Sequence, residues 1–217
     1  MVVATLTAAL LGVVGVVPSF HLVLSDGNDQ LSGRKDRIAE LVATHFRDMG
    51  VEVRWSFDPS DPSLPASNVV KVMVVPSSSA DWKLTPGVLA AVRRESESKA
   101  IVAVFYPEVE RLLGVRQPGS TATLQGWKPP GRRILHGVAR VVVHEILHYF
   151  LPGRPHDPDG VFMDHVGGNL LAHSSVEISA ETRDALVAAL LSRPRPAPYG
   201  VLGMTGSTRC DGYSAEW

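Results

Sequence analysis

The segment that most constrains the fold is residues 134–151, ILHGVARVVVHEILHYFL, which is apolar on nearly every side. A helix of that kind is buried in the middle of a domain. The segment nevertheless contains His144, Glu145 and His148, and such groups are costly to bury unless they are paired or bind a metal. Pro152 and Gly153 then end the helix. The sequence therefore predicts a buried helix whose titratable side chains serve a purpose other than packing.

The elements around this helix are predicted from the spacing of apolar residues. Apolar or alternating runs predict strands at 20–26, 51–57, 69–75 and 100–106, with the strand at 69–75 central in the sheet. Helical spacing and capping residues predict helices at about 32–49, 85–94, 107–114 and 179–191. This order predicts a single α/β (α+β) domain, with a mixed sheet, a backing helix and the buried helix.

Composition excludes some classes of partner. A chain of 217 residues suffices for one domain with a sizeable core, and its formal net charge of −1 gives no strong field towards nucleic acid or an anionic membrane. With one cysteine, Cys210, the chain can form no intramolecular disulfide.

The first residues suggest export. Residues 1–17 carry no charged side chain, and Pro18 ends this apolar run. Its length is typical of the apolar region of a secretory signal. We therefore expect a signal peptide or membrane anchor at 1–18, the folded domain at 19–192 and a flexible tail at 193–217. The expected location is secreted or membrane-anchored, with a cytoplasmic location as the alternative.

The spacing H-E-x-x-H at residues 144–148 predicts a zinc site. Two histidines four residues apart stand on the same face of a helix, where both can bind one ion. Glu145 points about a quarter-turn away, so it misses the metal and can reach a zinc-bound water as general base.

A catalytic zinc ion needs a third protein ligand. Gly153 can take a left-handed conformation and reverse the chain, which would bring His156 back to the metal. Glu177 or Glu181 is the alternative third ligand. His45 and His136 are expected to pack in the core, and His21 and His173 lie in no motif.

The segment HEILHYFLPGRPH followed by GVFMD resembles the metzincin class of zinc peptidases, whose pattern is H-E-x-x-H-x-x-G-x-x-H. The spacing from Gly153 to His156 matches that pattern, and two extra residues precede Gly153. The resemblance implies a metzincin-like fold, a zinc cofactor, and Met163 as the residue of a methionine turn beneath the metal. It also implies that a peptide or protein substrate lies along a sheet edge near residues 100–106.

Three residues are assigned weaker roles. Asp164 and His165 could orient a metal ligand, although exposed loop residues are the simpler interpretation. Cys210 could occupy the open zinc position as a latch, although an inert cysteine in the tail is favoured. The function that fits best is that of a zinc metallopeptidase; a zinc-stabilised binding domain without turnover, or another zinc hydrolase such as an amidase, is the alternative.

Overall fold

The computed structural model describes residues 17–65, 68–76, 87–96, 98–115, 131–164, 167–173 and 177–193. The expected signal or anchor, apart from Val17 and Pro18, lies outside these residues, as does the expected tail beyond Arg193. Among the described residues, no helix has both the length and the apolar composition needed to cross a membrane.

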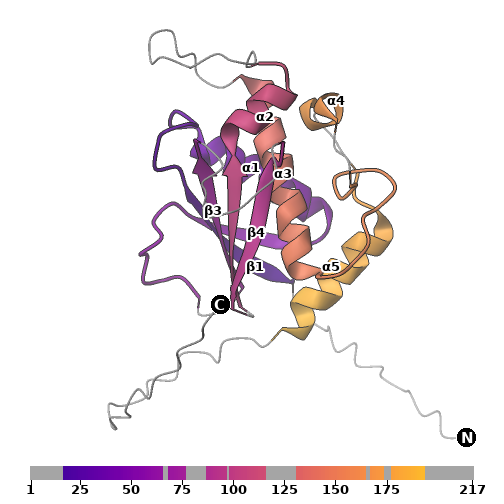
Figure 1. Ribbon diagram of the computed structural model, residues 1–217. Coiled ribbons are helices and arrows are strands. Elements are labelled where there is room, and N and C mark those ends of the chain that lie inside the picture. The colour runs from indigo at the N-terminus through magenta and orange to yellow at the C-terminus, as the bar shows by residue number, and fades with distance from the viewer. Residues whose placement is uncertain are drawn as a thin grey trace, which may run out of the picture.

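A five-stranded sheet forms the centre of the molecule (Figure 1), and its mixed character is as the sequence predicts, although the sequence predicts only four of the strands. The strands are β1 (Ser19–Ser25), β2 (Glu52–Ser56), β3 (Val69–Val75), β4 (Ala90–Ser96) and β5 (Lys99–Phe105). Their order is β2-β1-β3-β5-β4, so the expected central position of residues 69–75 is confirmed. All neighbours are parallel except β4 and β5, which are antiparallel.

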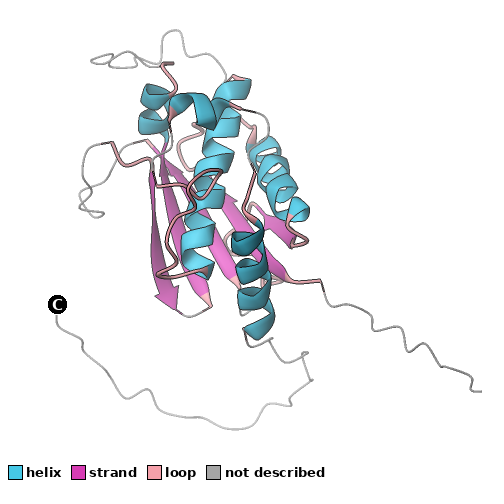
Figure 2. Ribbon diagram, turned by 90° about the vertical axis from the view of Figure 1, so that its right-hand side faces the viewer, coloured by secondary structure: helices cyan, strands magenta, loops and turns pink. Residues whose placement is uncertain are grey.

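The helices lie on one side of the sheet (Figure 2). They are α1 (Lys35–Asp48), α2 (Tyr106–Leu112), α3 (Arg132–Phe150), α4 (Gly168–Ala172) and α5 (Ala180–Ser192). The ring of Phe20 on β1 joins the two layers, because it packs against Phe46 of α1 at 4.8 Å and against Phe150 of α3 at 5.1 Å. Backing helix α1 buries His45, as expected from its position on the apolar face.

Helix α3 is the predicted buried helix. Fourteen of its nineteen residues are buried, which agrees with the apolar residues found on all its sides in the sequence. It contacts α1 on one side and β4, β5, α2, α4 and α5 around the rest of its surface. Side chains on α3 therefore reach solvent only where neighbouring segments leave a gap, and His144, Glu145 and His148 are among the partly exposed ones.

Two predictions about the fold are wrong. Residues 90–94 were expected in a helix and form part of strand β4, because pairing with β5 overrides the local helix preference of alanine and arginine. Residues 100–106 were expected near a sheet edge, but β5 lies between β3 and β4. The edge strand on that side of the sheet is β4.

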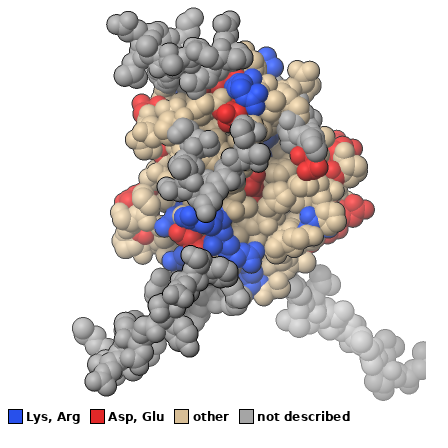
Figure 3. Space-filling model, viewed as in Figure 1, with Lys and Arg blue, Asp and Glu red and all other residues tan. Residues whose placement is uncertain are grey.

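The surface carries charges of both signs. Acidic and basic side chains both occur on the face shown in Figure 3, with basic ones gathered in its lower part. This mixture is in keeping with the formal net charge of −1.

Candidate metal centre

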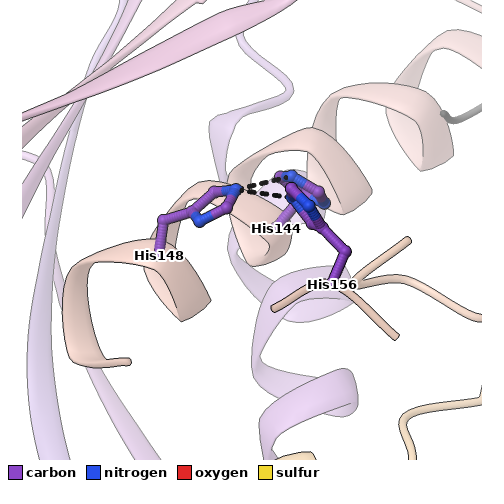
Figure 4. Close-up of side chains that lie close together, drawn as sticks. All are labelled: His144, His148 and His156. Carbon is purple, nitrogen blue, oxygen red and sulfur yellow. Dashed lines mark hydrogen bonds between the residues drawn. The ribbon is translucent and has the colours of Figure 1, made fainter. Parts of the chain in front are cut away.

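Two of the three histidines come from consecutive turns of α3. His144 and His148 are four residues apart on this helix, so their side chains project from the same face. Figure 4 shows the two rings turned towards each other, with the ring of His156 beside them. The Nε2 atoms of His144 and His148 are 3.0 Å apart.

The third histidine arrives through a sharp reversal of the chain. Helix α3 ends at Phe150, the amide of Arg154 donates to the carbonyl of Leu151, and Gly153 has φ of 74°. That left-handed conformation favours glycine, because a Cβ atom crowds the backbone there. The returning chain places Nε2 of His156 3.1 Å from Nε2 of His148 (Figure 4).

A hydrogen bond at the far side of the His144 ring fixes which of its nitrogens faces inward. Nδ1 of His144 lies 2.9 Å from the carbonyl oxygen of Val161, which can only accept, so Nδ1 is the donor. Nδ1 of His156 lies 3.5 Å from Oδ1 of Asp164, which is within ion-pair range. A neutral imidazole that carries its hydrogen on Nδ1 has a lone pair on Nε2. His144 therefore turns a lone pair towards His148.

This arrangement fits a metal ion. A hydrogen on Nε2 of His148 could point at only one of the two ring nitrogens that face it, whereas a cation accepts all three nitrogens. Two imidazole nitrogens on one tetrahedral zinc ion are about 3.3 Å apart, given Zn–N distances of about 2.0–2.1 Å. The separations of 3.0 and 3.1 Å come close to this value. The possible ligand atoms of the three histidines all lie within 4.8 Å of one another.

Burial keeps the histidines in the form that binds metals. Burial lowers the pKa of His144, and burial together with the neighbouring histidines lowers the pKa of His148 to about 4. At neutral pH both rings are therefore uncharged, and neutral imidazole is the form that ligates a metal.

Phe162 forms the apolar floor of the site. Its side chain is fully buried, and its ring centroid lies 5.5 Å from that of His144, 5.0 Å from that of His148 and 5.2 Å from that of His156. The sequence assigns this place to the next residue, Met163. Met163 is partly exposed, and the structure pairs its backbone with that of Asp157. The ring contacts to the histidines thus belong to Phe162, while a role for Met163 stays a prediction.

Glu145 follows His144 on α3 and lines a cavity beside it. One residue further along a helix means a turn of about 100°, so Glu145 points away from the face that carries the three nitrogens. Burial raises the pKa of its carboxyl to about 7. A carboxyl with such a pKa can both accept and donate a proton near neutral pH.

A buried carboxylate holds the loop that carries His156. Both carboxylate oxygens of Asp157 lie 2.8 Å from Oγ1 of Thr182, which is fully buried, and one accepts from Oγ of Ser179 at 2.9 Å. Ser179 also caps α5, because its Oγ accepts from the amide of Thr182. The amide of Asp157 donates to the carbonyl of Phe162 at 2.9 Å. The residue after His156 is therefore tied both to α5 and to the floor of the site.

A second contact fastens the same loop. The amide of Val161 donates to the carbonyl of Glu177 at 3.1 Å, and Val161 itself holds Nδ1 of His144. Gly160 has φ of 82°, and a Cβ atom there would lie 2.3 Å from the Glu177 carbonyl oxygen. Only glycine allows the two segments to approach so closely.

The other sequence candidates are not part of the cluster. Within the described residues the potential metal ligands group as three histidines, without Glu177 or Glu181. His165 and Cys210 lie outside the described residues. Asp164 contacts His156, as expected if Asp164 orients a metal ligand. Roles for Asp157, Phe162 and Thr182 were not predicted from the sequence, because their partners are distant along the chain.

The comparisons with known proteins give one likeness in structure. No protein-family model matches the chain, and no curated protein matches it. Among solved structures, the fold is similar to the crystal structure of archaemetzincin from Methanopyrus kandleri, with 15% identity and a TM-score of 0.47. The match covers 82% of this chain and 99% of that chain. A likeness of this degree says nothing about the activity of the present chain.

Proposed function

We propose that the chain is a zinc-dependent peptidase in which His144, His148 and His156 hold the ion and Glu145 is the general base. The observation that carries this proposal is the convergence of three imidazole nitrogens, 3.0 and 3.1 Å apart, beside a partly buried carboxyl that lines a cavity. The sequence resemblance to metzincins supports the same conclusion, because its pattern falls on these residues.

Each residue of the site has its own role in the proposed hydrolysis. A zinc ion held by the three histidines would lower the pKa of a water and polarise a carbonyl group. Glu145 takes the proton from the attacking water and passes it to the leaving amine. Burial raises the pKa of Glu145 to about 7, which suits a carboxyl that both accepts and donates a proton near neutral pH. Phe162 excludes water from the inner side of the three rings.

The peptide is proposed to lie along β4. This strand is the edge of the sheet, and its first residue, Ala90, lines the same cavity as His144 and Glu145. An extended peptide can add to such an edge through main-chain hydrogen bonds. This placement replaces the one expected from the sequence, which put the substrate beside residues 100–106.

The proposal is tested with Glu145→Gln. The variant should keep about one zinc ion per chain, because Glu145 is not a ligand, and should lose hydrolysis of a broad peptide library. Glu181→Gln is the matched control, since Glu181 is exposed on α5 and should be dispensable for both. Metal analysis and mass spectrometry of the library provide the two measurements.

The results separate this proposal from its alternatives. A chelator-sensitive activity that survives in Glu145→Gln would remove the general base from its role. A zinc-stabilised binding domain would hold zinc and cleave no peptide even in the unaltered protein. Absence of zinc that cannot be restored would overturn the metal centre itself.

A further inference from the structure

Helix α4, which packs against α3 (Figure 1), forms one wall of a cavity of about 510 Å³ that adjoins the metal centre. The cavity borders His144 and Glu145 on α3, Leu112 at the end of α2, and Gly167 and Leu171 at α4. Its size lies within the range of ligand sites, which is about 300–1,000 Å³. The way in which α4 sits against α2 and α3 therefore determines the size and shape of this cavity.

The start of α4 lies so close to the end of α2 that only glycine fits there. A Cβ atom at Gly168 would lie 2.3 Å from the carbonyl oxygen of Leu112 and 3.3 Å from its carbonyl carbon. The obstacle is backbone, which cannot swing away as the tip of a side chain can. A methyl group at position 168 would therefore push α4 and the end of α2 apart, and both of these segments line the cavity.

The other end of α4 is held by a buried cation. Arg140 is 2% exposed and stands on α3, one helical turn before His144. Its Nη2 donates to the carbonyl of His173, the residue that follows α4. The last carbonyl groups of a helix lack a partner within the helix, and an arginine side chain can supply one. Arg140 makes further interactions, and this hydrogen bond connects α4 directly to the helix that carries two of the metal ligands.

We propose that Arg140 and Gly168 are positioning residues for substrate specificity. They fix α4 as a wall of the cavity, and so limit the size of the side chain that a substrate can place beside Glu145. The walls include Val141 and Leu171, so the favoured side chain is apolar. In an apolar pocket one methylene group changes kcat/KM by about 10–200-fold, so even a small shift of α4 is measurable. This inference rests on the proposed peptidase function and narrows its substrate class.

Hydrogen exchange of the full chain, read by mass spectrometry, tests the anchoring without any substrate. The amide of Leu171 donates to the carbonyl of Gly167 at 3.1 Å and reports on α4. Arg140→Met should accelerate exchange in the peptide that holds residues 167–173 by about tenfold to hundredfold, as expected when a hydrogen bond to a charged group is lost. Arg140→Lys keeps a cationic donor, so its exchange should be intermediate. Arg133→Met, at an exposed position of the same helix, is the matched control and should exchange like the unaltered protein.

Unchanged exchange at residues 167–173 in Arg140→Met would overturn the inference. Equal acceleration in strand β5 would overturn it as well, because the loss would then be general and not confined to α4.

Cleavage tests the consequence for specificity. Fluorogenic peptides carry leucine or tryptophan, in turn, at each of the two residues that flank a scissile bond located first by library digestion. Gly168→Ala should raise kcat/KM for tryptophan relative to leucine by about tenfold at one of these positions, because separating α4 from α2 enlarges the cavity. Arg140→Met should shift the same ratio in the same direction. Gly27→Ala is the control for an added methyl group, since nothing lies within 4 Å of a Cβ atom there and Gly27 does not line the cavity.

The outcomes distinguish this inference from the proposed function. A loss of active protein lowers kcat/KM for both peptides equally, so a changed ratio cannot come from destabilisation alone. If the ratio of tryptophan to leucine stays at its unaltered value in both variants, the role in specificity fails while the peptidase stands. If the unaltered protein cleaves no peptide, the peptidase fails, and hydrogen exchange still decides whether Arg140 anchors α4.

Discussion

Thr182→Val tests whether the contact between α5 and the metal-carrying loop supports the centre. The substitution keeps the shape of the side chain and removes a hydroxyl that lies 2.8 Å from both oxygens of Asp157. Both residues are buried, at 0% and 8% exposure, so water cannot replace the lost donor. A hydrogen bond to a charged group contributes about 1.5–3 kcal/mol, and Asp157 keeps Ser179 as a donor at 2.9 Å. We therefore expect the free energy of unfolding to fall by about 2 kcal/mol.

Two measurements check this expectation. Urea unfolding gives the free energy, and a shift of about 4–8 °C in Tm should accompany it in a protein of this size. Competition with a chelating dye should show zinc bound about tenfold to hundredfold less tightly, as when an outer partner of a metal ligand is lost. Thr44→Val is the control, because Thr44 is exposed on α1 and should change stability by about 0.5 kcal/mol at most. A Thr182→Val protein that matches this control in both measurements would refute the reasoning.

Three further predictions concern the ligand, the turn and pH. His156→Ala should weaken zinc binding as much as His148→Ala does, and Glu177→Ala should not; the reverse order in dye competition would assign the third ligand to Glu177. Gly153→Val should weaken zinc binding more than Gly153→Asn, because asparagine tolerates positive φ and a β-branched residue does not. Equal zinc affinities of the two variants would show that the left-handed turn does not support the metal centre. Burial lowers the pKa of His45 below its unfolded value of about 6.5, so the unfolded chain takes up this proton at higher pH than the folded chain as pH falls from about 7 to 5. Wild type should therefore lose stability relative to His45→Gln over that range in urea unfolding, and a constant difference would contradict the shift.

The parts of the fold that the sequence predicted well are those where local pattern and final environment agree. Residues 69–75 alternate little and are rich in valine, and they form the central strand β3 with the same bounds. Strand β4 was missed because its residues 90–94, AAVRR, favour a helix when considered alone. Their conformation is decided by the ladder to β5, which no local pattern contains.

In the site, too, local relations could be predicted from the sequence and long-range contacts could not. His144, Glu145 and His148 could be identified because their relation is set by the pitch of one helix. Asp157 and Thr182 are 25 residues apart, and Arg140 reaches the backbone of His173 33 residues away, so their roles depend on how loop and helices pack. Phe162 could have been noticed as an apolar residue between Val161 and Met163. Nothing in the sequence indicated that it, rather than Met163, contacts the rings.

Two residues, Leu151 and Pro152, separate the end of helix α3 from Gly153, and the third histidine still reaches the cluster. Helix α3 continues past His148 through Tyr149 and Phe150, which are 2% and 3% exposed and pack into the core. The reversal at Gly153 begins only after these residues, and Nε2 of His156 still reaches 3.1 Å from that of His148. What the three-nitrogen cluster requires is thus a left-handed reversal followed three residues later by a histidine.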